Sequence, residues 1–500
     1  MFISNRKTVL TTIAAAILVV QLSTACGQGT PAAPSPEEFL PVTKLVISTA
    51  AEPDPPLRYT LIPAYGDLQP GNAATSYYRA ITLLPRDATE TFGDEQQDWR
   101  DVPLAEFPCE KARDWLNNYD VVLSELRVAT VRETCDWNHR VRELQGLDPV
   151  SFLLPEMSKI RELARILRVK ARLEIAERRF DDALATMTTG YRLAENTGKS
   201  PLLISVLVGI SVARIMEPCV TDWIEAGGPN LYWALASLPD PLIDIRVALQ
   251  QEMNLPLQMF PFLKDPEHAN HTPEQWKQIL AEATQQLSDL NRLTSAGRQR
   301  GVDADLVAQS MGLAIILAGY SAAKVQLIAS GMDAATVEAM PVGQVVAIQT
   351  ARAYQKAYQE SMKWTLLPYW QAREPMDASF MDLQSKGFIG QTGGMPCAIP
   401  IVPLLLPSVS SATYAPVRLR RDLSALQAVE ALRMSLARSG GQWPQSLDEL
   451  TCAPVPIDPV TGQSFTYTKL ENGNVELILA PPPGRPASNF GKRFELELKK

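Results

Sequence analysis

The chain has 500 residues, of which 46% are hydrophobic and 20% charged, so it is globular and long enough for about two or three domains. Its formal net charge of -8 argues against nucleic acid as the main partner, because phosphate binding requires concentrated Lys and Arg. The basic run Arg418-Leu419-Arg420-Arg421 is too short to change this balance, and we interpret it as the solvated start of a helix.

Residues 1–25 have the layout of a secretory signal peptide. Arg6 and Lys7 precede an apolar run at 9–20, and small residues follow it. The run is shorter than the roughly 20 residues that a helix needs to span a bilayer, so a retained transmembrane helix is the weaker interpretation. The sequence therefore predicts export.

The end of this segment, Leu22-Ser23-Thr24-Ala25-Cys26, resembles a bacterial lipobox. The resemblance implies that Cys26 carries the lipid and that the chain meets a membrane through an N-terminal lipid. Ser23-Thr24-Ala25 also fits ordinary signal cleavage, which would release a soluble secreted protein. Residues 26–41 are small, polar and rich in proline, and we predict a flexible tether that spaces the folded part from the lipid.

An odd number of cysteines remains if Cys26 is lipidated, so at least one thiol is unpaired within the monomer. They are Cys109, Cys135, Cys219, Cys397 and Cys452. Cys109 with Cys135 and Cys397 with Cys452 are the nearest-neighbour pairings for an oxidising compartment. The alternative is that each is a free cysteine that packs as a small hydrophobe.

The segment 42–385 is predicted to be a mainly helical domain with a short extended start. VTKLVIST and LRYTLI are two candidate strands, separated by the turn-rich AEPDPP. Helical spacing begins near Gly71, in NAATSYYRAITLL, and continues through CEKARDWLNNY and VVLSELRVATVRE. Pro85 is expected to stop the first of these helices.

The clearest helical pair lies at 156–195. One apolar stripe comprises Ile160, Ala164, Leu167, Ala171 and Ile175, with charges of both signs on the other face. The next stripe comprises Phe180, Leu184, Met187, Tyr191 and Ala194. Because the connection between them is short, the two helices are expected to pack as an antiparallel hairpin.

This pair resembles a tetratricopeptide hairpin over about residues 164–195. Ala171, Ala183 and Gly190 stand where that repeat places small residues, and Phe180 stands at its aromatic position. The resemblance covers one unit, without the family's usual Gly and Pro punctuation, and a repeat of about 34 residues does not recur elsewhere. We therefore predict an irregular helical-hairpin array or bundle rather than a regular solenoid.

Two later helices are unusually apolar, PLLISVLVGISVARIM and MGLAIILAGYSAAKVQLIASG. Polar residues interrupt both before spanning length, so we interpret them as buried core helices. VVAIQTARAYQKAYQESMKW continues the bundle. Residues 386–415 are rich in Gly and Pro and are predicted to be a connection that packs against a neighbour.

A small α+β module is predicted at 416–482, followed by a C-terminal tail at 483–500. It begins with a helix at about 417–438, which Gly440 and Gly441 end. The module resembles the globular end of the type II secretion major pseudopilin, which implies a helix followed by short antiparallel strands. The matching residues are Gln442, Trp443, Pro444, Pro456, Asp458, Pro459, Gly462, Phe465 and Tyr467. APPPGRPASNFGK replaces the family's acidic calcium loop.

The sequence contains only incomplete matches to known catalytic motifs. Gly198-Lys199-Ser200 lacks the first glycine of a phosphate loop, since Leu193 stands there. Ser321 and Lys324 match the SxxK of penicillin-interacting enzymes, whose partner motifs are absent from the sequence, so we interpret them as an ordinary helix pair. Cys135 and His139 are close in sequence, but such pairs are recognised by spatial geometry.

Metal binding is the less favoured interpretation of His268 and His271, with Glu267 and Glu274 nearby. Thr272 and Gln275 predict a capping box at this point, so we favour a surface loop that leads into a helix. We predict no catalytic, metal or cofactor-binding residue and no cofactor.

Two classes of function remain open. The favoured one is a non-enzymatic envelope scaffold whose helical hairpins bind an unknown protein partner. The other is an envelope hydrolase that uses carboxylates not recognisable in the sequence, for which a buried Asp/Glu pair with separated pKa values would be the mark. An accessory role in a secretion apparatus rests on the C-terminal resemblance alone.

Overall fold

The computed structural model describes residues 40–85, 93, 96, 98–100, 102–146, 148, 154–294, 319–385 and 406–499. The fold is mainly α with a small sheet, which confirms the predicted fold class. The chain forms two compact units. Unit 1 contains the described residues of His139–Leu153 and Leu249–Thr413, and unit 2 contains those of Pro31–Asn138, Leu154–Ala248 and Tyr414–Lys500.

The first part of unit 2 contains the strand predicted at VTKLVIST and the helices predicted from about Gly71 onward. The elements are β1 (Val42–Ile47), η2 (Tyr65–Asp67), β2 (Gln69–Asn72), α2 (Ala73–Leu83), η3 (Leu104–Glu106), α5 (Cys109–Leu116), η4 (Asn117–Tyr119), α6 (Asp120–Thr130) and β3 (Arg132–Thr134). Asn72 caps α2 by accepting a hydrogen bond from the backbone N–H of Ala74 at 3.1 Å, and the helix ends just before Pro85. Strands β2 and β3 form a short parallel pair.

The second predicted strand, LRYTLI at 57–62, is wrong, because this segment consists of turns and irregular backbone. Its side chains pack against helices instead of forming a ladder. Leu61 is fully buried, and the ring of Tyr59 lies edge-on to that of Trp223 at 6.4 Å. The backbone carbonyl of Thr60 accepts a hydrogen bond from the Thr188 hydroxyl at 2.9 Å, so a side chain supplies the partner that a neighbouring strand would have supplied.

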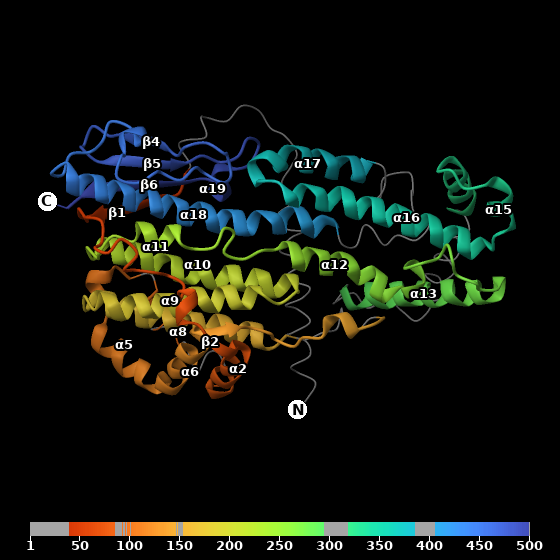
Figure 1. The fold of residues 1–500 in the computed structure, drawn as a ribbon, viewed down its shortest axis with the longest axis horizontal. Helices are drawn as coiled ribbons and strands as arrows, with labels where there is room; N and C mark the ends of the chain where they lie inside the picture. The colour runs from red at the N-terminus through yellow and green to blue at the C-terminus, as the bar shows by residue number, and fades with distance from the viewer. Residues whose placement is uncertain are drawn as a thin grey trace. The chain divides into compact units, whose positions relative to one another are not determined.

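Three helices form the centre of unit 2 and run side by side (Figure 1). They are α8 (Glu156–Ala176), α9 (Phe180–Gly198) and α10 (Leu203–Glu225), and the short α11 (Tyr232–Ala236) follows. The predicted hairpin of α8 and α9 is confirmed. Gly190 and Gly209 permit close packing, since a Cβ on Gly209 would lie 2.7 Å from the carbonyl oxygen of Ala194.

The charged face predicted for α8 is partly wrong. Glu162, Arg172 and Glu174 are each no more than 3% exposed, because neighbouring elements cover the helix on both sides. The apolar α10 is buried among the same neighbours, as expected for a core helix. Within the described part of the chain, α10 is the one helix long and apolar enough to cross a membrane, and 67% of its apolar window is buried.

Helix α18 (Leu406–Arg438) starts in unit 1 and continues from Tyr414 in unit 2. The rest of the C-terminal part of unit 2 consists of η9 (Leu447–Glu449), β4 (Thr466–Lys469), β5 (Val475–Leu479), α19 (Ala487–Phe490) and β6 (Lys492–Leu498). Strands β4, β5 and β6 are antiparallel neighbours. Strand β1 adds to β6 in parallel, giving the order β1-β6-β5-β4. The sheet therefore joins the two ends of the described chain.

Helix α18 begins at Leu406, within the predicted connection at 386–415, rather than near residue 417. It ends where predicted, at Gly440 and Gly441, which have positive φ angles. The interpretation of the basic run as a solvated helix start is wrong for Arg421, which is 2% exposed. Figure 1 shows α18 beside the sheet, and Arg421 donates hydrogen bonds to the backbone carbonyls of Ala480 and Phe490.

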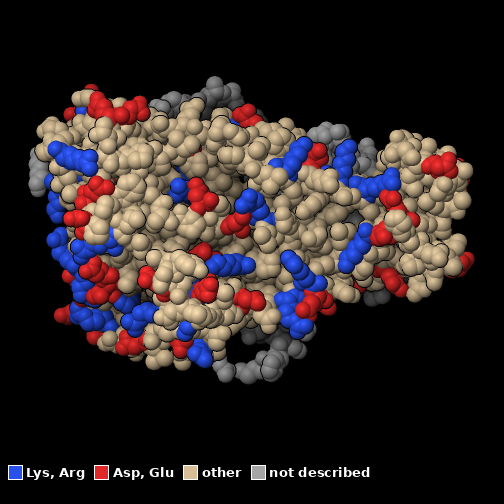
Figure 2. Space-filling view, viewed as in Figure 1, with Lys and Arg blue, Asp and Glu red and all other residues tan. Residues whose placement is uncertain are grey.

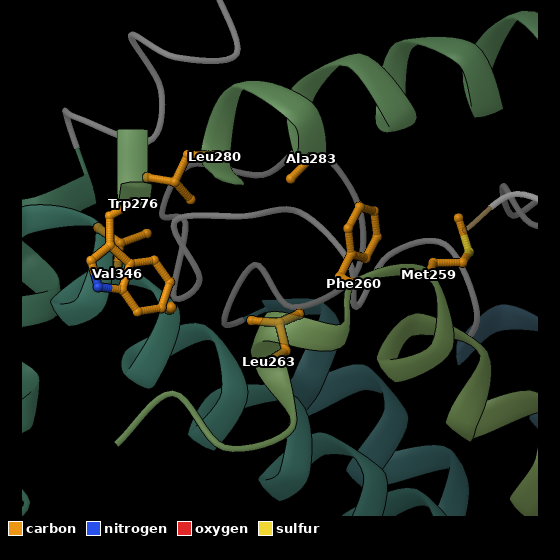
Figure 3. Packing of buried hydrophobic residues seen from close by; sticks show 8 residues of the cluster. Met259, Phe260, Leu263, Trp276, Leu280, Ala283 and Val346 are labelled. Carbon is orange, nitrogen blue, oxygen red and sulfur yellow. The ribbon is translucent and has the colours of Figure 1, made fainter. Parts of the chain in front are cut away.

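Unit 1 contains η5 (Val141–Glu143), η6 (Pro261–Leu263), α13 (Pro273–Thr294), a helix at 319–329, α15 (Ala334–Ala339), α16 (Val342–Met362), η7 (Lys363–Leu366) and α17 (Tyr369–Ser385). Helix α12 (Arg246–Met259) starts in unit 2 and ends in unit 1. One apolar core of unit 1 is shown in Figure 3. Trp276, Leu280 and Ala283 of α13 pack there with Phe260 and with Val346 of α16.

The signal peptide, Cys26, Cys397 and most of the predicted tether lie outside the described residues, as does the part of the predicted connection before Leu406.

Candidate functional site

Arg172 of α8 occupies the centre of a buried polar network in unit 2. Its Nε donates to Oδ2 of Asp222 on α10 at 2.9 Å, and its Nη2 donates to the carbonyl oxygen of Val102 at 2.6 Å. Nη1 donates to the carbonyl of Trp99, and the guanidinium lies 5.1 Å from the ring centre of Phe107. One guanidinium thus connects α8 to α10 and to the backbone at Trp99 and Val102.

Burial raises the pKa of Asp222, and the cations of Arg172 and Arg168 oppose that rise. Arg172 is 3% exposed, and all three of its guanidinium nitrogens donate hydrogen bonds to the protein. A buried charge with this many partners is a structural group, because each of its three nitrogens is already bonded to the protein. We therefore assign the Arg172–Asp222 pair to the architecture of unit 2.

A recess opens between α6, α8 and α9 of unit 2. Its volume is about 80 Å³. The lining residues are Leu123 and Arg127 of α6, Leu167, Lys170 and Glu174 of α8, and Asp182, Ala185, Thr186 and Thr189 of α9. Drug-sized ligands and cofactors occupy pockets of about 300–1,000 Å³, so this recess matches one or two side chains of a partner better than a whole cofactor.

The polar groups of the recess are partly committed to one another. Glu174 accepts hydrogen bonds from Lys170 and, at 2.6 Å, from the hydroxyl of Thr186. Asp182 is held by Arg179 at 2.7 Å. Arg127 is exposed at the edge, on the same helix as the buried Leu123. The recess therefore combines an apolar floor with a fixed polar wall and one exposed cation.

A pair of buried carboxylates lies elsewhere in unit 2. Glu217 of α10 and Asp422 of α18 are 8% and 6% exposed. Lys492 of β6 lies 3.5 Å from Oε1 of Glu217, and Arg214 lies 3.9 Å from Oδ2 of Asp422. Burial raises the pKa of Glu217, and the neighbouring Asp422 raises it further, while Lys492 and Arg214 lower it.

The two residues form a buried Asp/Glu pair, which is one part of what the hydrolase alternative requires, but neither carboxylate lines the recess between α6, α8 and α9. Neither lines the second recess, of about 10 Å³, which Leu242, Ile243 and Leu423 line. Sequence reasoning missed Glu217. The available signal was a charged residue inside an apolar helix, directly before Pro218.

The sequence candidates in unit 1 have ordinary structural partners. Lys324 pairs with Glu338 and not with Ser321. Nδ1 of His268 donates to Oδ1 of Asp265 at 2.7 Å, while Glu267 pairs with Arg352 at 2.7 Å. The ring of His271 lies edge-on to that of Trp276, at 5.1 Å between centres.

The predicted capping box at α13 is confirmed. The backbone N–H of Thr272 donates to Oε1 of Gln275 at 2.8 Å, and the backbone N–H of Gln275 donates to the Thr272 hydroxyl at 3.3 Å. Among the residues that the structure describes, no group of three or more His, Cys, Asp or Glu side chains is placed to hold a metal ion.

Gly198-Lys199-Ser200 lies at the end of α9 and before α10, and Lys199 pairs with Glu195 at 3.3 Å. A phosphate loop has a strand before it, whereas a helix precedes this segment. Cys135 and His139 belong to different units.

The four cysteines of the described chain are free thiols: Cys109, Cys135, Cys219 and Cys452. The pairing of Cys109 with Cys135 is therefore wrong, and the alternative of free cysteines holds for these positions. Burial raises the pKa of both Cys135 and Cys219 to about 12. Cys219 is fully buried in α10 and packs as a small apolar residue.

Comparisons of the chain with models of known protein families, with curated proteins and with solved structures gave no significant match. The resemblances to a lipobox, to a tetratricopeptide hairpin and to a pseudopilin thus stay predictions from the sequence.

Proposed function

We propose that the chain is an exported envelope protein, anchored to a membrane by a lipid on Cys26, that acts as a helical scaffold for a protein partner. The observation that carries the proposal is the recess between α6, α8 and α9. Its floor is apolar at Leu123 and Leu167, its wall is polar, and its edge bears Arg127. Protein–protein contacts typically surround such an apolar centre with polar groups and arginine.

Surface charge supports a protein partner over a strongly charged polymer. On the face shown in Figure 2, Lys and Arg alternate with Asp and Glu instead of gathering in a field of one sign. Such mixed surfaces suit specific, locally complementary contacts. The Pro-rich segment that follows Cys26 supports the anchor, because a lipidated terminus needs a spacer before the fold.

Site-specific photo-crosslinking in intact envelopes tests the scaffold. Benzoylphenylalanine in place of Arg127 is expected to form a discrete adduct with one protein. Tyr65 is the matched control in the same unit, since it is 84% exposed and does not line the recess. Adducts of equal yield at both positions, or none at position 127, would contradict the proposal.

The anchor has its own test. The intact mass of the mature protein from a membrane fraction should show a diacylated or triacylated Cys26 at the N-terminus. Cys26→Ser should move the protein to the soluble fraction, because one acyl-bearing residue provides the attachment. A mature terminus without lipid supports plain secretion instead.

A further inference from the structure

We propose that Glu217, Asp422 and Lys492 form a proton-controlled clamp that holds the start of strands β1 and β6 to helices α10 and α18. The clamp lies in unit 2, shares no residue with the recess and does not depend on the proposed function. Its ligand is the proton, and its action is to change how firmly the N-terminal strand is held.

The position of Lys492 is the first part of the argument. Lys492 is the first residue of β6, and its neighbour Arg493 is the register partner of Val42, the first residue of β1. The backbone N–H of Arg493 also donates to the carbonyl of Pro41 at 2.9 Å. The clamp therefore acts where the chain enters its first strand.

The second part is the crowding of like charges away from water. Glu217 and Asp422 come from different helices, and each is at least nine-tenths buried. Two carboxylates in such a place repel each other when both are ionised. Lys492 compensates only part of this repulsion, because it supplies one positive charge against two negative charges. Its Nζ lies 3.5 Å from Oε1 of Glu217 and 4.5 Å from the ring centre of Phe494.

The surrounding elements supply few other charges. Arg214, one turn before Glu217 on α10, faces Asp422 at 3.9 Å. From α9, Tyr191 is fully buried, has no hydrogen-bond partner for its hydroxyl and interacts electrostatically with Glu217. Pro218 removes a backbone donor from α10 at this point, so the helix is locally less constrained beside the carboxylates.

The direction of the pH effect follows from the raised pKa of Glu217. Folding takes up a proton at pH values between the ordinary glutamate pKa of about 4.5 and the higher folded value. The contribution of Glu217 to stability is therefore fully present below that window and is lost as the pH rises through it. Acidification weakens the attraction of Glu217 to Lys492, but it also removes the burial cost of the charge and the repulsion by Asp422, and the raised pKa means that this gain is the larger effect.

Denaturant unfolding of the full chain at a series of pH values tests the clamp. E217Q imitates the neutral acid, so near neutral pH it should unfold at a higher midpoint concentration of denaturant than the wild type. This difference between the two midpoints should disappear toward about pH 4.5. E471Q changes an exposed glutamate of the same unit and should follow the wild-type curve. A gap that is constant with pH would overturn the proposal.

Infrared spectroscopy of the protonated carboxyl band gives a second test that does not require E217Q to fold. D422N removes the repelling charge and should lower the pH at which the band of Glu217 titrates. K492M removes the attracting charge and should raise it. Shifts of opposite sign are the expected result, and a failure of both variants to shift the band would overturn the clamp.

Discussion

Arg421 and Asp458 form an ion pair in the interior of unit 2, with Nη2 of the arginine 2.6 Å from Oδ2 of the aspartate. Both side chains are at most 3% exposed. Asp458 also accepts a hydrogen bond from the backbone N–H of Val460 at 2.8 Å, which shapes the loop before β4. The pair therefore fixes that loop to α18.

Removal of one partner from this pair should destabilise unit 2 strongly. R421M leaves the Asp458 carboxylate buried without its cation, and we expect a loss of about 3–5 kcal/mol in the free energy of unfolding. Equilibrium denaturation measures it. R438Q is the matched control, since Arg438 is on the same helix, its side chain is 56% exposed and it lies 3.5 Å from Glu52. Similar losses for the two variants would show that the buried pair is not special.

The close contact of α9 with α10 gives a second prediction. A Cβ on Gly209 would lie 2.7 Å from the backbone oxygen of Ala194 and 3.0 Å from the backbone nitrogen of Gly198. Backbone atoms cannot rotate away, so G209A should lower stability by about 1–3 kcal/mol through overpacking. Thermal or denaturant unfolding tests this.

Gly66 provides the control for that substitution, because a Cβ there would meet nothing within 4 Å. G66A should leave the midpoint close to that of the wild type. If G209A were as well tolerated as G66A, the two helices would have to pack farther apart than described.

The helices were predictable because their signals are local. The stripe at Ile160, Ala164 and Leu167 is one face of a helix wherever that helix packs, and Thr272 with Gln275 forms a cap from residues of a single turn. These features depend on neighbours in the sequence, so the printed sequence contains them in full.

The sheet and the buried charges depend on residues far apart in the chain. Strand β1 pairs with β6 in parallel, which joins Val42 to Arg493, and local spacing does not specify such a partner. In the sequence, Arg421 resembles any basic residue near the helix start expected at about residue 417, and only the fold brings Asp458 and the carbonyl of Phe490 to it. The Glu217–Asp422 pair could not be predicted either, because its two residues are far apart in the sequence.

A third prediction concerns the thiols. Cys219 is fully buried, and burial raises its pKa to about 12, so both its access and its thiolate fraction are low. In the native protein, Cys219 should react with a thiol reagent much more slowly than the partly exposed Cys109. Mass spectrometry of labelled peptides measures both sites. Equal native rates would contradict the burial of Cys219, and denaturant should make the rates converge.

The core of unit 1 provides a fourth prediction, from two tryptophans of very different exposure. Trp276 is 1% exposed and packs with Phe260 and Val346 in the cluster of Figure 3, whereas Trp370 is 42% exposed. W276A removes a large buried ring and should destabilise unit 1 by about 3–5 kcal/mol.

W370A deletes the same number of atoms from the same unit, but these atoms are partly in water already, so the loss should be much smaller. Hydrogen exchange of α13 and α16 amides reports on unit 1 directly. Faster exchange in W276A than in W370A is the expected result. The reverse order would mean that the core of unit 1 does not depend on Trp276.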